Sequence, residues 1–320
     1  MRRATYLFAV MATAFLTACG GGDDDLPATT TATAAATTID KVAQDRGFTA
    51  LLAAATKAEL GSTLSDTNAQ LTVLAPTDAA FNNLATTLGF ANANAMVSAL
   101  PAAALKNILT YHVLPGNKPA SQLTAAAQSS QPTLYTFEGQ PALVTVSTAG
   151  GVKVGDAVLT NANVVATDVA ASNGVIHAID KVLVPPGVLN IVQMAQLNPE
   201  LSSLVSAVTR ANLQGTLTGA GPFTVFAPTN AAFAAAPSGL STQQLSTVLT
   251  YHVLGSQVLA SQIPFNTPVA TVAGQAITFN AGTPPTITDT TSTPARITAT
   301  NVRASNGVIH LVDKVLIPRL

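Results

Sequence analysis

The stretch ASNGVIHAIDKVLVP at residues 171–185 returns as ASNGVIHLVDKVLIP at residues 304–318, with 12 of 15 positions identical. Each copy places an Asn-Gly pair, a strong turn signal, directly before a short apolar run rich in β-branched residues. This pattern predicts a tight turn that leads into a buried strand. The two copies lie 133 residues apart, a distance that predicts a duplicated domain rather than a stack of short repeats.

Two further motifs repeat in the same order, upstream of this stretch. TVLAPTDAAF at residues 72–81 returns as TVFAPTNAAF at 224–233, and LTYHVL at 109–114 returns unchanged at 249–254. The offset between copies falls from 152 at the first of these motifs to 140 and then 133. The second copy is therefore shorter, mainly between the first two motifs and after the second. We predict two domains, 37–186 and 187–320, joined at Pro185-Pro186-Gly187.

The periodicity changes within each copy, and it predicts an α+β fold. Residues 102–110 and 242–250 have helical spacing and lead into the Tyr-His pairs, and apolar residues from Leu197 to Val208 also recur at helical spacing, with Asn198 as N-cap. LTVLAP and FTVFAP predict short buried strands that stop at a proline. The second half of each copy alternates in the manner of strands, with Gly150-Gly151 as a hairpin turn.

The ordered set TVxAPTxxAF, LTYHVL and xNGVIHxxDKVLxP resembles the fasciclin domain family, and it covers nearly all of residues 37–320 twice. The resemblance implies two tandem fasciclin-type domains. Each would be a compact β-sandwich wedge of about seven strands with several helices along one edge. It also implies a role in extracellular adhesion or matrix association.

The first 36 residues have the pattern of an exported, lipid-anchored protein. Residues 1–18 combine two arginines with a short apolar run, which is typical of a signal peptide. Leu16-Thr17-Ala18-Cys19 resembles a bacterial lipobox, which implies cleavage before Cys19 and acylation of that residue. Residues 19–36 then form a lipid-anchored tether, because they contain Gly, Asp, Thr and Ala and almost no large apolar residue. Gly20 in place of Asp implies the outer membrane of the cell envelope.

The composition excludes several functional classes. Charged residues make up 9% of the chain, Trp is absent, and 14 Lys and Arg residues are spread without a basic block. These features argue against a nucleic-acid partner. The single Cys rules out a disulfide framework, and no motif calls for a cofactor.

All four histidines lie in the repeated motifs. His177 and Asp180 of the first copy, and His310 and Asp313 of the second, are interpreted as structural residues. A metal site is not expected, because each copy offers two His and one Asp without Cys. Catalytic residues are not expected either, because no nucleophile elbow, P-loop or HExxH pattern occurs. A hydrolase would require Ser172, His177 and Asp180 to converge in a cleft.

The Tyr-His pairs leave two interpretations open. In the fasciclin family this motif has been linked to adhesion, which implies Tyr111, His112, Tyr251 and His252 as partner-binding residues. The alternative is that each pair anchors a helix end to the sandwich, because apolar-flanked motifs usually belong to the core. The leading hypothesis is a surface lipoprotein that adheres to extracellular matrix, polysaccharide or neighbouring cells. The competing hypothesis is a small-molecule or lipid-binding envelope protein with a pocket between helices and sandwich.

Overall fold

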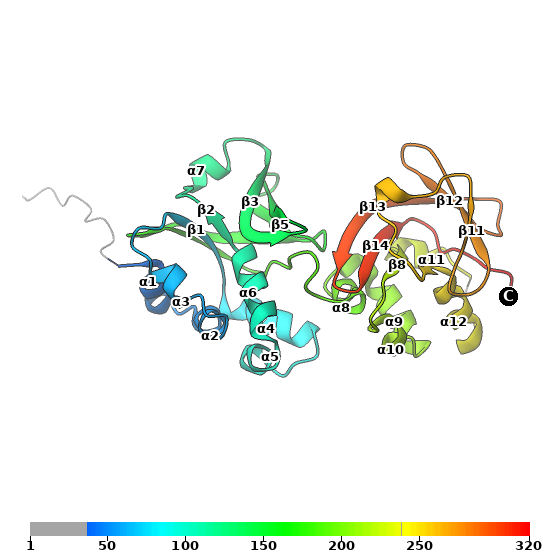
Figure 1. The fold of residues 1–320 in the computed structure, drawn as a ribbon, viewed down its shortest axis with the longest axis horizontal. Helices are drawn as coiled ribbons and strands as arrows, with labels where there is room; N and C mark the ends of the chain where they lie inside the picture. The colour runs from blue at the N-terminus through cyan, green and yellow to red at the C-terminus, as the bar shows by residue number, and fades with distance from the viewer. Residues whose placement is uncertain (1–36, 238) are drawn as a thin grey trace, which may run out of the picture. The chain divides into compact units, whose positions relative to one another are not determined.

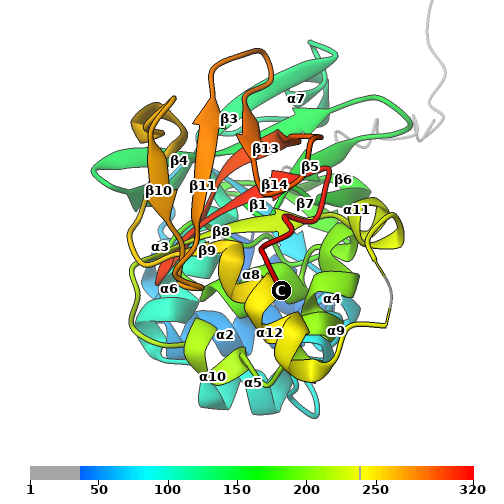
Figure 2. The ribbon, with the colours of Figure 1, turned by 90° about the vertical axis from the view of Figure 1, so that its right-hand side faces the viewer.

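The computed structural model describes residues 37–237 and 239–320, and these contain two domains of the same architecture (Figure 1). The predicted signal peptide, Cys19 and the tether lie outside the described residues. Each domain has one seven-stranded sheet and a group of helices. In both domains most helices gather on one side of the sheet, whereas α7 lies apart from the other helices of the first domain (Figures 1 and 2).

The first domain starts with helices and ends with strands. Its sheet has the order β2-β1-β7-β6-β5-β4-β3, in which β1 and β7 are parallel and all other pairs are antiparallel. The helices are α1 (Ile39–Asp45), α2 (Thr49–Lys57), α3 (Gly61–Ser65), α4 (Asp78–Thr87), α5 (Ala93–Ala99), α6 (Ala102–Tyr111) and α7 (Ala120–Leu123). The strands are β1 (Leu71–Pro76), β2 (Val113–Pro115), β3 (Gln128–Phe137), β4 (Gln140–Ser147), β5 (Lys153–Gly155), β6 (Asn161–Ala171) and β7 (Gly174–Ile179).

The second domain repeats this order with fewer helical residues. Its sheet has the order β10-β11-β12-β13-β14-β8-β9, and its parallel pair is β8 with β14. The helical elements are α8 (Ile191–Gln196), the 3-10 turn η1 (Pro199–Leu201), α9 (Ser202–Arg210), α10 (Gln214–Leu217), α11 (Asn230–Ala234), α12 (Thr242–Tyr251) and the 3-10 turn η2 (Ala260–Gln262). The strands are β8 (Phe223–Pro228), β9 (Val253–Leu254), β10 (Pro268–Ala270), β11 (Ala276–Asn280), β12 (Thr286–Thr288), β13 (Ala295–Ala304) and β14 (Gly307–Val312).

The parallel pair, which lies one strand in from an edge of each sheet, is buried on both faces. In β1, Val73 and Ala75 pack into a core under the helices, whereas Leu74 packs into a second core on the other face of the sheet. Successive side chains of a strand point to opposite faces, so a strand between two cores is apolar at every position. This explains why the motif residues of β1 and β7 form near-continuous apolar runs rather than an alternating pattern.

The sheet of the first domain curls around its second core. The terminal strands of the sheet order, β2 and β3, contact each other, and side chains from β1, β4, β5 and β7 fill the space inside. The prediction of an α+β fold, with a sandwich-like sheet and helices along one side, is confirmed.

Local sequence signals set the helix starts. The hydroxyls of Thr77 and Thr229 accept hydrogen bonds from the N–H groups of Ala80 and Ala232, and so cap α4 and α11. Asn198 caps its helix through the Glu200 N–H, but the first turn is the 3-10 element η1, and α9 begins only at Ser202. The single helix expected here is therefore divided. Among residues 37–237 and 239–320, no helix is both long and apolar enough to cross a membrane.

Candidate functional site

The Tyr-His pair of the first domain lies at the end of α6, inside the protein. Tyr111 and His112 are each 1% exposed. The Tyr111 hydroxyl donates a hydrogen bond of 2.9 Å to the carbonyl of Leu143 on β4, and its ring meets that of Tyr135 edge-on, with centroids 6.2 Å apart. Burial, reinforced by the charge of Asp156, raises the pKa of Tyr111. The phenol therefore ties the helix end to the inside of the sheet.

Both ring nitrogens of His112 are used by the main chain. Nδ1 lies 2.7 Å from the carbonyl oxygen of Ile108, and Nε2 accepts a hydrogen bond of 2.8 Å from the N–H of Leu183. This arrangement places the proton on Nδ1 and requires a neutral ring. Burial lowers the pKa of His112 from 6.5 to about 4, although the hydrogen bond to Ile108 acts in the opposite direction. His112 thus connects α6 to the segment that follows β7.

The second domain reproduces this geometry. Tyr251 donates to the carbonyl of Ala276 at 2.9 Å. His252 Nδ1 lies 2.7 Å from the carbonyl oxygen of Val248, and Nε2 accepts from the Leu316 N–H at 2.9 Å. Burial again lowers the pKa of this His, to about 4. The two copies agree to within 0.1 Å in these contacts, and in neither copy does the pair reach the surface.

The histidines of the longest motif are buried as well. His177 accepts from the Asp168 N–H at 3.3 Å through Nδ1, and its Nε2 lies 3.0 Å from the carbonyl oxygen of Lys118. His310 has the matching contacts, with the N–H of Asn301 at 3.4 Å and the carbonyl of Val258 at 2.9 Å. Its ring also stacks on Phe226, and burial lowers its pKa.

The motif aspartates hold the neighbouring strand. Asp180 accepts hydrogen bonds from the N–H and the side-chain amide of Asn163, at 2.7 and 2.6 Å. Asp313 accepts from the Arg296 N–H at 2.7 Å. The partners of His177 are main-chain atoms of other residues, so Ser172, His177 and Asp180 do not form the hydrogen-bonded set that a hydrolase needs. In the described part of the chain, no three His, Cys, Asp or Glu residues gather as metal ligands.

A second acidic residue in each domain escaped the sequence analysis. The side chain of Asp156 is fully buried, forms an ion pair with Lys181, and accepts a hydrogen bond of 3.0 Å from the Val184 N–H. The equivalent Asp289 contacts Lys314 at 2.6 Å and the N–H of Ile317 at 2.8 Å. Extending the offset of 133 residues upstream of the longest motif would have paired these two aspartates.

The pKa of Asp289 reflects two opposing effects. Burial alone raises this pKa, but the hydrogen bonds from Lys314, Thr291 and the Ile317 N–H outweigh burial and lower it. The Lys of each DKVL segment therefore neutralises a buried aspartate rather than serving the adjacent Asp180 or Asp313.

The Asn-Gly pairs are more than turns. Asn173 is fully buried, and it accepts from the Ile39 N–H at 2.9 Å and donates to the carbonyls of Leu64 and Asp66. A Cβ on Gly174 would stand 1.9 Å from the carbonyl oxygen of Leu71. Asn306 and Gly307 repeat both features in the second domain, where the same distance, to Phe223, is 2.1 Å.

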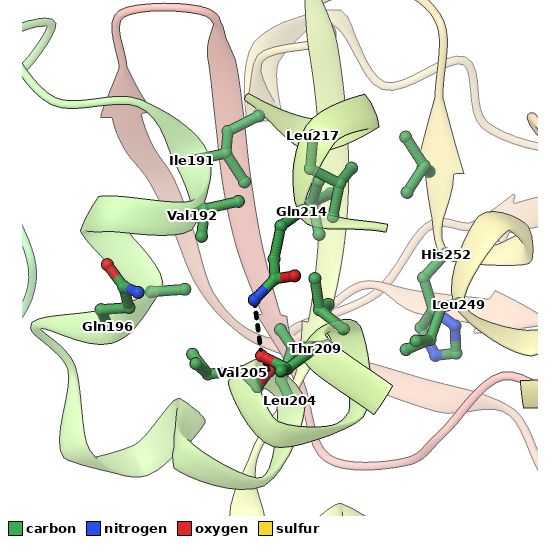
Figure 3. A pocket seen from close by; sticks show the side chains of 14 residues that line it. Ile191, Val192, Gln196, Leu204, Val205, Thr209, Gln214, Leu217, Leu249 and His252 are labelled. Atoms are coloured by element: carbon green, nitrogen blue, oxygen red, sulfur yellow. Dashed lines mark hydrogen bonds between the residues drawn. The ribbon is translucent and has the colours of Figure 1, made fainter. Parts of the chain in front are cut away.

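The competing hypothesis predicts a ligand pocket between the helices and the sheet. At this place in the second domain the structure has a small apolar cavity. It lies among α8, α9, α10 and β8, and Figure 3 shows Ile191, Val192, Leu204 and Leu217 around it. The hydrogen bond of 2.8 Å from Gln214 to Thr209 closes one side (Figure 3). A volume of about 30 Å³ holds one or two water molecules at most, whereas pockets for organic ligands measure roughly 300–1,000 Å³.

The surface above the buried Tyr111 is uncharged and partly apolar. On the outer face of β3 and β4, Leu134 is 38% exposed and Leu143 is 56% exposed. Their neighbours on this face are Ser130, Thr136 and Thr145. We call Leu134, Leu143 and these three residues the β3–β4 face. In the second domain the position of Leu143 is taken by Ala276, so the apolar part of this face belongs to the first domain.

Comparison with known proteins identifies the family. The model of the fasciclin domain matches residues 46–185 and again residues 199–318. The chain belongs to the fasciclin domain family. This is an adhesion-type family rather than a family of enzymes.

Proteins that are similar to this chain come from bacteria and animals. Protein sll1483 of Synechocystis sp. is 40% identical over 138 residues, which are 41% of this chain and 74% of that protein. Transforming growth factor-beta-induced protein ig-h3 of Sus scrofa is 28% identical over 274 residues, 82% of this chain but only 35% of the animal protein. The solved FAS1 domain pair of the insect cell adhesion molecule Fasciclin I aligns with a TM-score of 0.42 at 18% identity, covering 87% of this chain and 95% of that one.

Proposed function

We propose that this protein is an exported, lipid-anchored adhesion protein that binds matrix, polysaccharide or a neighbouring cell through its exposed strand faces. One observation carries the proposal: in both copies, the Tyr, His and Asp side chains of the motifs form hydrogen bonds inside their own domain. Contact with a partner must then use other residues. Tyr111, His112, Tyr251 and His252 support the fold, which favours the anchoring interpretation over direct contact.

The β3–β4 face is the strongest candidate for contact. Its outer residues carry no charge, and Leu134 and Leu143 add apolar area that a folded domain usually avoids exposing in a contiguous patch. Serine and threonine hydroxyls beside them can form neutral hydrogen bonds, each worth about 0.5–1.5 kcal/mol. Such a face suits a weak, many-point contact, and membrane anchoring of many copies would add avidity.

The contact can be tested on the full chain made soluble by Cys19→Ser. Binding to immobilised polysaccharides and to surface-protein extracts is compared for this protein, for Leu134→Asp/Leu143→Asp, and for the Tyr111→Phe variant. We expect the double variant to lose binding and keep its thermal midpoint, because both residues are exposed. Tyr111→Phe should lower the thermal midpoint, but at temperatures below that midpoint it should still bind. Unchanged binding by the double variant would exclude this face.

Anchoring has a separate test. Under the proposal, cells grown with an alkynyl fatty acid label the wild-type protein, and Cys19→Ser removes the label and moves the protein from the membrane fraction to the soluble fraction. A labelled Cys19→Ser protein would contradict the lipobox interpretation. A strain that lacks the gene should also attach less to surfaces and aggregate less.

A further inference from the structure

The two domains differ most at one place on their helical side. In the first domain, α5 packs against α2 and α4, and it buries Ala93, Met96 and Val97 in the core under the helices. The C-terminal end of α5 is held by Lys57, whose Nζ lies 2.9 Å from the carbonyl oxygen of Val97 and 2.6 Å from that of Ser98. A cation at this end of a helix satisfies carbonyls that have no partner within the helix.

The second domain has no counterpart of α5 in the part of it that the structure describes. Between the phenylalanine of the first motif and the start of the next helix region, the first domain has residues 82–100, whereas the second has only residues 234–240. The elements that would receive α5 are all present, since α9, α11 and α12 repeat α2, α4 and α6. However, α11 has five residues, whereas α4 has ten. The loss therefore comprises α5 and the C-terminal half of α4.

A hollow of about 590 Å³ lies where α5 would be. We call it the α5 groove. Its walls include Ser206 and Ala207 of α9, Phe233 of α11, and Leu245 and Val248 of α12. The last two correspond to Leu105 and Ile108, which belong to the core that receives Met96 and Val97 in the first domain.

The groove retains the features that hold α5 in the other copy. Phe81 is only 1% exposed in the first domain, whereas its counterpart Phe233 is partly exposed at the groove. Arg210 occupies the position of Lys57 at the rim. Within residues 37–237 and 239–320, Arg210 makes no side-chain hydrogen bond or ion pair. An apolar wall and a cation for helix carbonyls are thus both available.

We propose that the α5 groove binds a short amphipathic helix of a partner protein, with the chemistry of α5. Two adjacent apolar side chains, in the manner of Met96 and Val97, would enter the groove between α9 and α12. The C-terminal carbonyls of the incoming helix would face Arg210. This is the helix-in-groove mode of recognition, in which a few apolar anchors supply most of the affinity.

Other occupants fit less well. A second copy of this chain offers α5 itself, but that helix is already buried in its own first domain. A lipid or other apolar small molecule would leave the guanidinium of Arg210 without a role, because helix carbonyls or an acidic group are what it would bind. The first domain shows directly that a helix of seven residues fits such a site.

The probe is a labelled synthetic peptide with the sequence of residues 90–101, and the protein is the full chain with Cys19→Ser. Fluorescence anisotropy should show saturable binding, and a peptide with Asp at both the Met96 and the Val97 positions should bind at least tenfold more weakly. Arg210→Glu should weaken binding about threefold to tenfold. Lys106→Glu is the matched control, because Lys106 is an exposed cation of the first domain, and it should leave binding unchanged.

Two variants fill the groove in different ways. One replaces residues 234–240 with residues 82–100, so that the second domain gains its own α5. The other is Ser206→Phe, which adds bulk at an exposed wall position and is expected to fold. Both should reduce peptide binding at least tenfold. Equal binding by wild-type and filled proteins would overturn the proposal. Self-association that both variants abolish would instead assign the groove to a second copy, and would also overturn it.

Discussion

The two domains share the buried hydrogen bonds of their Tyr-His pairs and differ on their helical side. Tyr111 and Tyr251, and His112 and His252, donate to and accept from equivalent main-chain groups in both copies. In contrast, the described part of the second domain has no counterpart of α5, and Ala276 of that domain takes the position of the exposed Leu143. The difference teaches that the motifs record what the fold requires. Whatever distinguishes the functions of the two domains lies outside the motifs.

The largest effect is expected at the glycines of the Asn-Gly pairs. Gly174→Ala and Gly307→Ala would each drive a Cβ to about 2 Å from a main-chain oxygen. We expect each variant to lower the free energy of unfolding of its own domain by at least about 4 kcal/mol, which is enough to unfold that domain. The chain has no Trp, so a Trp at Phe90 or at Phe265 reports on one domain by fluorescence. Unfolding of both domains by either variant would contradict the expectation that each glycine supports its own domain.

His112→Ala and His252→Ala should have the next largest effect. Each removes a ring that satisfies one buried N–H and one buried C=O, and each leaves a cavity. We expect a loss of about 3–5 kcal/mol per domain, measured by urea unfolding of the two Trp reporters. Equal losses in the two domains would support the shared structural role. A loss below about 1 kcal/mol in either would show that its ring is dispensable.

Acid should weaken both domains over the same pH range. His112 and His252 have pKa values of about 4 in the folded protein and 6.5 as ordinary histidines. The unfolded chain therefore binds protons first as the pH falls. The stabilisation is complete above pH 6.5 and is lost progressively down to about pH 4, by about 3 kcal/mol per domain. His112→Gln should flatten this dependence in the first domain alone, and an unchanged slope would contradict the assignment.

The smallest effect on stability is expected at two equivalent cations, Lys57 of the first domain and Arg210 of the second. Lys57→Ala removes the cation from the C-terminal carbonyls of α5 and should cost about 1 kcal/mol in the first domain. Arg210→Ala should cost nothing measurable, because the matching helix is missing from the described second domain. Thermal unfolding with the two Trp reporters compares them directly. A destabilising Arg210→Ala would show that the arginine serves the domain itself.

Much of the fold was predictable because the same motifs occur in the same order in both domains. The repeated motifs indicated the order of elements, and in the structure their threonines, Thr77 and Thr229, cap α4 and α11. The change of periodicity within each copy predicted the α+β fold, and the family resemblance added the sandwich-like sheet with helices along one side; both are confirmed. Periodicity could not show that the helix after Asn198 is divided, because the apolar spacing is the same on both sides of the 3-10 turn.

The roles of individual side chains were less accessible. The sequence pointed to Asp180 and Asp313, which stand beside Lys in the motif, but the lysines pair with Asp156 and Asp289 far along the chain. Such pairing depends on how strands curl in space, and no local pattern reports it. The α5 groove was equally hidden. The falling offset located the deletion, but only the packing of α9, α11 and α12 shows that the deletion leaves a hollow.

The hydrogen bond between Ile39 and Asn173 has a consequence for how the chain is made. It joins the first helix of the domain to its last motif, 134 residues along the chain. In the same way, β1 pairs in parallel with β7, the last strand of the domain. Contacts of this sequence separation make folding slow. A growing chain cannot complete the first domain until residue 179 has been added, and the second domain waits in the same way for its own last strand. Each domain can therefore complete its parallel strand pair only near the end of its own synthesis.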